Sequence, residues 1–261
     1  MTTIARLLEQ RSIGEVMLRM QQAGPAIIRE SGSLKLRISK GTTEAILINA
    51  GGGIAGGDVI TVNAEVGPQA TLTLTSQAAE RVYRSLGPPA KVDVSLKAEA
   101  GSKLFWLPQE TILFQHSALQ RKLHVELDEN ATFLGVETLL FGRLEMGENV
   151  TGLDISDHWH IKRAGKLLHV ENLKLGPHFP NSITTLGDNR AMATVLLVSP
   201  EAEKKLERVR SVLTKKDGAS AWNGKLVARL VARDGFHLRK TLIKVLMACA
   251  GEKSLPKTWT F

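Results

Sequence analysis

Apolar and polar residues alternate along much of the chain before residue 140, with the period of two that is typical of β-strands. Three segments, which begin at Val62, Val94 and Leu123, share one arrangement: an alternating strand, a short turn and a second alternating strand. Their starts lie about 30 residues apart. A repeat of this length predicts strand pairs that stack, each covering the apolar face of the pair before it. A meander with evenly spaced turns would show a similar pattern.

The C-terminal part combines another strand pair with two helices. The strand pair runs from 157 to 175 and turns at Ala164-Gly165. Ser199-Pro200-Glu201 has the composition of a helix start, with serine as the N-cap and proline at the first helical position. A second helix has one apolar face between residues 238 and 249 and ends at Gly251.

These elements predict a mainly β, solenoid-like (β-helical) architecture with two helices in the C-terminal part. We expect a single domain over residues 1–261, because no low-complexity linker divides the chain. Its parts are N-terminal strands in 1–43, a repeat-like β core in 44–150, and a β-hairpin with two helices in 151–261.

Five glycines occupy seven residues directly after an apolar strand that begins at Glu44: Gly51, Gly52, Gly53, Gly56 and Gly57. The letters fit G-x-G-x-x-G, the fingerprint of dinucleotide binding, but that motif requires a helix to follow. The residues after Asp58 alternate instead and predict a strand, and the Gly-Lys-Ser/Thr of a P-loop is absent. The glycines therefore indicate a tight turn between two strands.

The net charge of +8 would suit a nucleic-acid-binding protein. However, lysine and arginine are spread along the whole length, and aromatic residues for base stacking make up only 5% of the chain. The same charge would suit an acidic protein partner. Cys249 is the only cysteine and lies on an apolar helix face, which suits a core position and a reducing compartment. The sequence shows neither a signal peptide nor a membrane span, and we expect a cytoplasmic protein.

Two places combine carboxylates with apolar surroundings. In the segment 106–111, WLPQET, a proline interrupts a strand, and Gln109 and Glu110 stand next to the interruption. Glu137 has a comparable place in the third repeat. Such carboxylates are either paired with arginine or placed for function, and ion pairs are the simpler explanation. Three arginines are candidate partners: Arg81, Arg84 and Arg143.

His158 and His160 stand two residues apart in an alternating segment, so both rings face one side of a strand and could bind one metal ion. A zinc or nickel site would need further ligands, which the sequence does not locate. A partly exposed strand edge is the simpler interpretation. A metalloenzyme built on this pair and a basic nucleic-acid-binding β protein are the two alternatives to the function considered next.

The chain resembles the UreD (UreH) family of urease accessory proteins in six segments that follow one another in the family's order. The segments are INAGGGIAGGD, TSQAAERVYRS, WLPQETILF, VETLLFGRLEMGE, WNGKLVARL and LPKTW. The resemblance extends from about Glu44 to the C-terminus. The N-terminal forty residues match less well, because Glu30-Ser31-Gly32-Ser33-Leu34-Lys35 replaces the family's usual His-Arg-Gly-Pro-Leu stretch.

The resemblance implies a scaffold rather than an enzyme. Members of the family dock on apo-urease and recruit UreF and the GTPase UreG, and together they deliver nickel to the urease active site. GTP hydrolysis is then expected in UreG, and this chain would hold no tightly bound cofactor, only Ni²⁺ in transit. Nucleic acid and membranes are not expected partners. The family fold is largely β and solenoid-like with two helices, in agreement with the repeats.

The resemblance also implies residues. An internal polar tunnel has been proposed as the nickel route in this family, and Glu137 matches the motif that contributes to it. Asp58, Glu110 and Glu148 belong to shared motifs and are further candidates for a transient nickel path. Other shared positions are candidates for partner contacts or structural support: Gly51, Gly52, Gly53, Gly56, Gly57, Tyr83, Arg84, Trp106, Pro108, Gln109 and Arg143.

Overall fold

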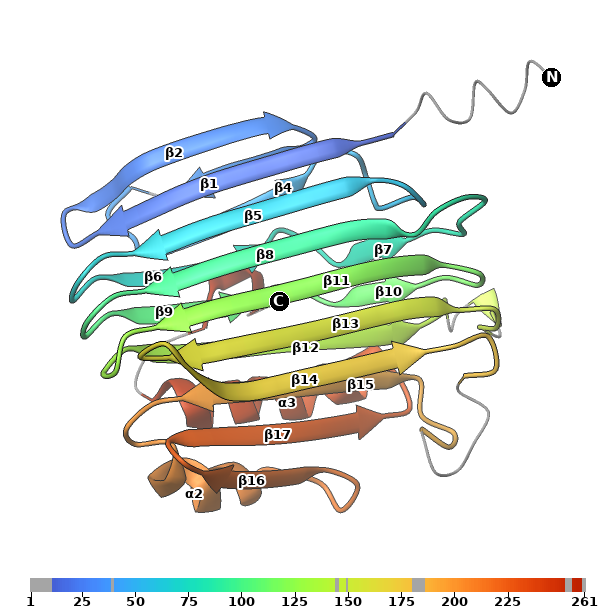
Figure 1. Cartoon of the computed structure of the whole chain (residues 1–261). Coiled ribbons are helices and arrows are strands. Elements are labelled where there is room, and N and C mark those ends of the chain that lie inside the picture. Colours follow the sequence, from blue (N-terminus) through green and yellow to red (C-terminus); the bar gives the residue numbers. More distant parts are fainter. Residues whose placement is uncertain are drawn as a thin grey trace.

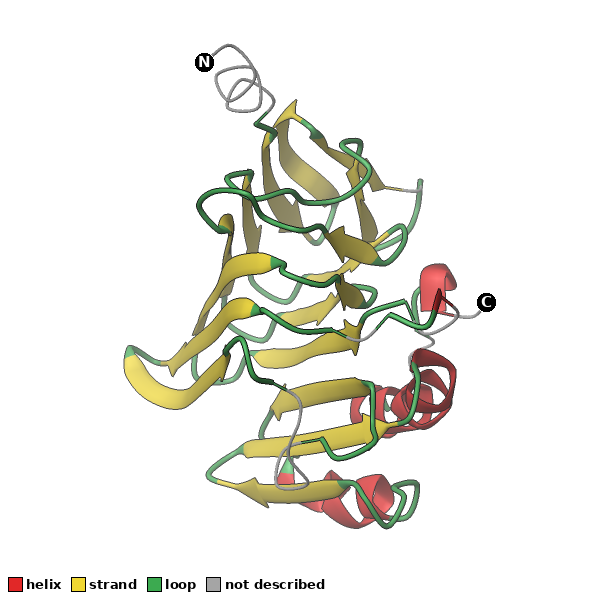
Figure 2. Cartoon of the chain, turned by 90° about the vertical axis from the view of Figure 1, so that its right-hand side faces the viewer, coloured by secondary structure: helices red, strands yellow, loops and turns green. Residues whose placement is uncertain are grey.

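The alternating segments form two β-sheets that face each other across a shared core (Figure 1, Figure 2). The computed structural model describes residues 11–38, 40–143, 146–148, 150–179, 186–251 and 255–259. The chain crosses from one sheet to the other and back once per rung, and the stacked rungs make a β-solenoid of about four turns. The predicted mainly β, solenoid-like fold is therefore confirmed.

The strands of the two sheets are as follows. The first sheet has seven strands, in the spatial order β14 (Lys166–Leu175), β13 (Asp154–Arg163), β11 (Ala118–Leu127), β8 (Ala90–Ala98), β5 (Val59–Val66), β1 (Ile13–Gln21) and β2 (Gly24–Gly32). The second has ten, with β16 (Gly218–Trp222), β17 (Lys225–Ala232), β15 (Ala191–Val198), β12 (Thr132–Phe141), β9 (Lys103–Leu107), β6 (Thr71–Ser76), β4 (Glu44–Asn49) and β3 (Leu34–Ile38) in order. Two short strands, β7 (Glu80–Val82) and β10 (Thr111–Leu113), pair beside this path.

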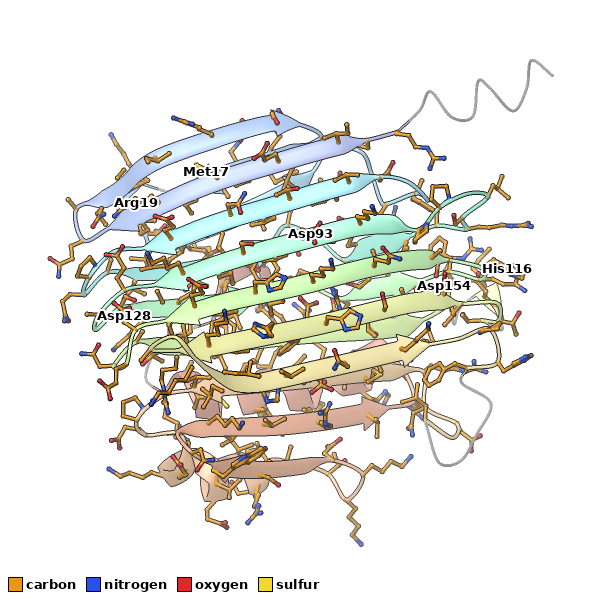
Figure 3. The ribbon with its side chains drawn as sticks, in the orientation of Figure 1. Met17, Arg19, Asp93, His116, Asp128 and Asp154 are labelled. Carbon is orange, nitrogen blue, oxygen red and sulfur yellow. The ribbon has the colours of Figure 1, made fainter. Side chains whose placement is uncertain are left out.

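The three repeats seen in the sequence are three successive rungs, formed by β5 with β6, β8 with β9, and β11 with β12. Corresponding strands of neighbouring rungs are parallel in both sheets. Alternation assigns each residue to a face: in β5, Val62, Ala64 and Val66 are buried in the core. Figure 3 shows the outer face of the same sheet, where side chains such as Arg19 and Asp93 point away from the core. The stacked strand pairs predicted from the repeat are confirmed.

The two ends of the rungs differ in the length of their connections. The end marked by Asp128 in Figure 3 has short turns, whereas the end marked by His116 and Asp154 has longer loops that include the glycine-rich turn. At this second end Ile54, β7, β10 and β12 pair in parallel, one after the other. Family segments that are far apart in the sequence therefore lie side by side along one side of the stack.

The N-terminal strands complete one end of the solenoid. β1 runs parallel to β5, and β2 pairs with β1 in the antiparallel direction as the edge strand. All residues of β2 after Gly24 are exposed. On the opposite sheet, β3 and β4 form an antiparallel pair.

The second predicted helix is confirmed as α3 (Gly235–Ala250), which packs on the outer side of the second sheet against β15 and β17 (Figure 2). Asp234 caps its N-terminus by accepting a hydrogen bond from the His237 N–H at 2.8 Å. Gly251 ends the helix with a φ of 80°. The apolar face of α3 and the outer side of the second sheet enclose a second core. Cys249 lies in this core and is 1% exposed, as its position on the apolar face predicted. None of the helices described is long and apolar enough to cross a membrane.

The first predicted helix is shorter than the sequence suggested. It consists of a 3-10 turn, η2 (Glu203–Lys205), followed by the five-residue α2 (Leu206–Arg210). The Ser199 Oγ accepts the Glu201 N–H at 3.1 Å, so Ser199 caps a turn that precedes the helix. The strands β15, β16 and β17 were not predicted from the sequence. The residues of β15 are almost all buried, so the segment shows no alternation.

Candidate functional site

Three charged side chains meet inside the solenoid: Arg121 of β11, Glu137 of β12 and Asp157 of β13. The Arg121 Nη1 lies 2.5 Å from the Glu137 Oε2, and the Arg121 Nη2 lies 2.6 Å from the Asp157 Oδ2. All three residues are at most 6% exposed. The Trp106 Nε1 donates to the second Glu137 oxygen at 2.9 Å, and the Thr111 Oγ1 accepts from the Arg121 Nη1 at 3.2 Å. We call Arg121, Glu137 and Asp157 the charged cluster.

Strand register explains why these side chains meet. Arg121 and Asp157 are directly paired across the parallel strands β11 and β13, so they point to the same side of the first sheet. Glu137 approaches from the second sheet. In β12, Phe133 packs in the core between the sheets, whereas its neighbour Leu134 packs in the core under α3. Glu137 has the same parity as Phe133 and therefore faces the interior of the solenoid.

Cavities lie on both sides of Glu137. A first cavity of about 90 Å³ lies between the sheets and has a largely apolar lining; its polar lining residues are Asn49, Ser76, Glu80, Gln109, Thr111, Arg121 and Glu137. A second cavity of about 20 Å³ has these polar lining residues: Glu137, Asp157, Glu171, Thr194 and Arg229. A third cavity, of about 160 Å³, lies at Gly52 and Gly53 and shares Asn49, Ser76 and Glu80 with the first. The three cavities follow one another, and Glu137 stands between the first and the second.

Burial controls the protonation of Glu137. It raises the pKa of this carboxyl to about 7; the charge of Arg121 acts in the opposite direction, and repulsion from Asp157 adds to the increase. The short contact with Arg121 would by itself favour the ionised form. Burial prevails because it is the largest of these effects. Burial also raises the pKa of Glu80, which lines the first cavity.

This raised pKa predicts a pH dependence of stability. Between pH 4.5 and pH 7 the unfolded chain releases the Glu137 proton while the folded chain retains it, so the free energy of unfolding falls as the pH rises. We expect the free energy of unfolding of the wild type to fall by about 2 kcal/mol across this window. Glu137→Gln removes the titrating group and should not show this fall. Urea unfolding at pH 5 and pH 7.5 measures the difference.

Glu126→Gln is the control, because Glu126 lies on the exposed face of β11. It should keep the wild-type difference between the two pH values. Equal pH profiles for the wild type and Glu137→Gln would contradict the raised pKa.

The structure separates the four carboxylates suggested for a nickel path. Glu137 lines two of the cavities described above. Asp58 is buried at the glycine-rich turn, where its two oxygens accept the Ser12 and Ala55 N–H groups, each at 2.8 Å. Both oxygens of Asp58 thus hold the backbone of this turn.

Glu110 and Glu148 lie in ion pairs near the ends of the rungs. The Glu110 Oε1 is 2.8 Å from the Arg239 Nη1, and the Glu148 Oε2 is 3.0 Å from the Arg143 Nε. The other Glu148 oxygen accepts the Gln115 N–H at 3.0 Å. The Glu110 contact connects its segment with α3, and the Glu148 contacts connect the segments that carry Gln115 and Arg143.

The ion-pair partners expected for the buried carboxylates were wrong. The candidate partners were Arg81, Arg84 and Arg143, whereas Glu137 pairs with Arg121 and Glu110 pairs with Arg239. The expectation failed because pairing depends on which elements the fold brings together: Arg121 lies on the opposite strand of the same rung as Glu137, and Arg239 lies on α3.

The glycine-rich segment forms the predicted turn. Gly52, Gly53 and Gly57 have positive φ values, which favour glycine. The Tyr83 ring packs directly against Gly53, where any Cβ would collide with it, and the Tyr83 hydroxyl donates to the Gly52 carbonyl at 3.0 Å. The Gly51 N–H donates to the Asn49 Oδ1 at 2.9 Å.

The neighbouring motif residues hold the same side of the stack. Gly56 leaves room for Ser85, whose side chain a Cβ at this position would meet. Arg84 pairs with Ser117 in an isolated antiparallel bridge. The guanidinium of Arg143 lies 4.7 Å from the centre of the Phe114 ring.

The interrupted strand supplies part of the wall of the first cavity, which Trp106, Pro108 and Gln109 all line. The Gln109 Oε1 accepts from the Arg239 Nη1 at 2.9 Å, and the Gln109 N–H donates to the Ser76 Oγ at 2.8 Å. The interruption therefore lets a polar side chain connect the cavity wall with α3.

Arg121 and Asp157 were not predicted from the sequence, although both interrupt an apolar series in their strands. In ALQRKLHVEL the inward positions are Leu119, Arg121, Leu123 and Val125, so a single arginine stands in an otherwise apolar series. Asp157 breaks the series of β13 in the same way. A charged residue in the apolar phase of a strand indicates a buried partner.

The histidine pair is placed on the outside of the first sheet. The His158 Nδ1 lies 2.6 Å from the Asn172 Oδ1, and the His160 ring lies 6.0 Å from the His124 ring, measured between their centres. Over the described ranges, no group of three or more His, Cys, Asp or Glu side chains is placed to hold a metal ion.

Comparison with known proteins is consistent along the whole chain. The family model described as "UreD urease accessory protein" matches residues 4–260. Urease accessory protein UreD of Brucella suis is 40% identical over 259 residues, which cover 95% of this chain and 93% of the relative. Urease accessory protein UreD 1 of Brucella anthropi is 41% identical over 276 residues, covering 99% and 98% of the two chains. Urease accessory protein UreD of Xanthobacter autotrophicus is 41% identical over 266 residues, covering 97% and 92%.

Proposed function

Since the chain belongs to the UreD family of urease accessory proteins, which serve urease maturation and are not enzymes, we propose that it docks on apo-urease with UreF and the GTPase UreG and assists nickel insertion. In this role the chain is a cytoplasmic scaffold. It brings no nucleotide site of its own, and the energy of GTP hydrolysis comes from UreG.

The observation that carries the proposal is the place of Glu137. It is a buried carboxylate between two cavities, and the cavities extend from the glycine-rich turn to the side of Glu171 and Arg229. Nickel is the cargo in this proposal and moves through the interior from one carboxylate to the next. Three further carboxylates line the same series of cavities: Glu80, Asp157 and Glu171.

The chemistry of the lining suits an ion that must be released again. Ni²⁺ binds imidazole and thiolate ligands firmly, whereas separate carboxylates, amides and hydroxyls hold it weakly. Cys249, the only cysteine of the chain, lies in the core under α3 and lines none of the three cavities. Asp58, Glu110 and Glu148 serve this proposal indirectly: Asp58 and Glu148 fix loops at the end of the rungs, and Glu110 ties its segment to α3.

The test is the nickel content and activity of the cognate urease, expressed with its other accessory proteins, in the presence and absence of this chain. We expect urease to be inactive and poor in nickel without the chain and to recover when the chain is restored. Equal activation without the chain would refute the proposed function. Binding to polyanions that falls steeply with salt would then support the nucleic-acid alternative.

A further inference from the structure

The Arg121 guanidinium fills the space between two carboxylates that face each other across the solenoid. It contacts Glu137 at 2.5 Å through one terminal nitrogen and Asp157 at 2.6 Å through the other. Arg121 is 6% exposed, so water does not replace either contact. A single cation thus bridges carboxylates that belong to the two opposite sheets.

The charged cluster is not optimised for stability. Two carboxylates face one guanidinium, and within the described part of the chain the Arg121 Nε and the Asp157 Oδ1 have no hydrogen-bond partner. A buried ion network of this kind is often no more stable than well-packed apolar side chains of the same volume. An incompletely satisfied cluster in the core therefore calls for an explanation other than stability.

The cluster also stands at a boundary. Arg121 lines the first cavity, Asp157 lines the second, and Glu137 lines both. An ion that moves from one cavity to the other must pass between the two carboxylates, where the guanidinium now lies. The free Asp157 Oδ1 gives this pair a further oxygen that could bind a cation.

Two neighbours of the cluster make contacts that do not depend on the position of the guanidinium between the carboxylates. Thr111, which accepts a hydrogen bond from Arg121, also lines the first cavity and so offers a partner on that side. The Trp106 N–H donates to the Glu137 oxygen that Arg121 does not contact and keeps this carboxylate oriented.

We propose that Arg121 stands in the place of a divalent cation between Glu137 and Asp157, and that an incoming nickel ion must displace its guanidinium to pass. The identity of the ion rests on the proposed function, whereas the cation site itself follows from the cluster. Arg121 is a positioning residue here: its guanidinium occupies the space between the two carboxylates until a cation of higher charge arrives.

The test counts bound Ni²⁺ by equilibrium dialysis of the full chain, purified alone or with UreF, without urease present. Arg121→Met removes the guanidinium and keeps similar volume, and it should bind one Ni²⁺ per chain more than the wild type. Adding Glu137→Gln and Asp157→Asn to this variant should remove the extra ion. Arg239→Met is the control, because Arg239 also pairs with a carboxylate but lies outside the cluster; it should gain no ion.

Thermal unfolding tests the proposal even if the Arg121 substitutions weaken the fold. Saturating Ni²⁺ should raise the Tm of Arg121→Met, and of the neutral, polar Arg121→Gln, by about 5 °C and leave the wild-type Tm unchanged. Folded variants that bind no extra ion would overturn the proposal, as would variants that stay unfolded with Ni²⁺. Because urease is absent from both measurements, their failure leaves the activation test of the proposed function unaffected, and the reverse also holds.

Discussion

Glu137→Gln is expected to lower urease activation by about tenfold or more, the scale on which loss of a group that supports metal binding is usually felt. Glutamine keeps the size of the side chain and an oxygen for the Trp106 N–H, but it loses the negative charge between the two cavities. The complex with UreF and urease should form as before, because Glu137 is 6% exposed and cannot contact a partner directly. Activation of apo-urease, measured as urea hydrolysis and as bound nickel per active site, gives the result.

A matched control shows whether the effect comes from the carboxylate at position 137 or from the net charge of the molecule. Glu126→Gln removes one carboxylate from the exposed face of β11, in the opposite sheet, and should leave activation unchanged. If Glu137→Gln loses UreF or urease from the complex, the residue has a structural role. Full activation by the variant would remove Glu137 from the nickel path.

Trp259→Ala is expected to cause a large loss of stability, about 3–5 kcal/mol. Trp259, at the end of the 3-10 turn η3 (Lys257–Trp259), is fully buried, and its Nε1 donates to the Leu107 carbonyl at 2.9 Å. The Arg239 guanidinium lies 4.8 Å from the centre of its ring. Because Arg239 also holds Gln109 and Glu110, the substitution should loosen the wall of the first cavity as well as the C-terminal segment.

Chemical denaturation of the wild type and of Trp259→Ala measures this effect. Unfolding is monitored by circular dichroism, at wavelengths where the signal does not depend on tryptophan. Trp222→Ala is the comparison, because Trp222 is 44% exposed; the Lys225 Nζ lies 4.7 Å from the centre of its ring. Its cost should stay below about 1 kcal/mol. Similar costs for the two substitutions would mean that the C-terminal segment does not hold the cavity wall.

The β core could be predicted from the sequence because the alternation of apolar and polar residues indicates which face of a strand is buried. In β5, Val62, Ala64 and Val66 alternate with polar residues, and the structure buries these three. The same rule fails for β15, where both faces are covered and the segment is uniformly apolar. The predicted length of the first helix was wrong for a different reason: Ser199 caps a turn, and the helix begins only several residues after that turn.

The site was predicted only in part. Glu137 was singled out by its apolar neighbours in the sequence, which agree with its burial, and the resemblance to the family then suggested its role on a nickel path. Its partner Arg121 could be recognised as unusual, but no local pattern states which arginine meets which carboxylate. Arg239 makes the point most clearly: it pairs with Glu110, which lies 129 residues away in the sequence. Such pairs are fixed by the stacking of rungs and helices.

The rung construction also determines which changes in chain length the molecule can accept. Neighbouring strands of a sheet are about 4.8 Å apart, so one rung inserted between β5 and β8 would lengthen the interior by that distance. Such an insertion would leave Arg121, Glu137 and Asp157 adjacent, because they come from β11, β12 and β13. A rung inserted between β11 and β13 would instead separate Arg121 from Asp157. Relatives of different length should therefore place their extra rungs on the N-terminal side of β11.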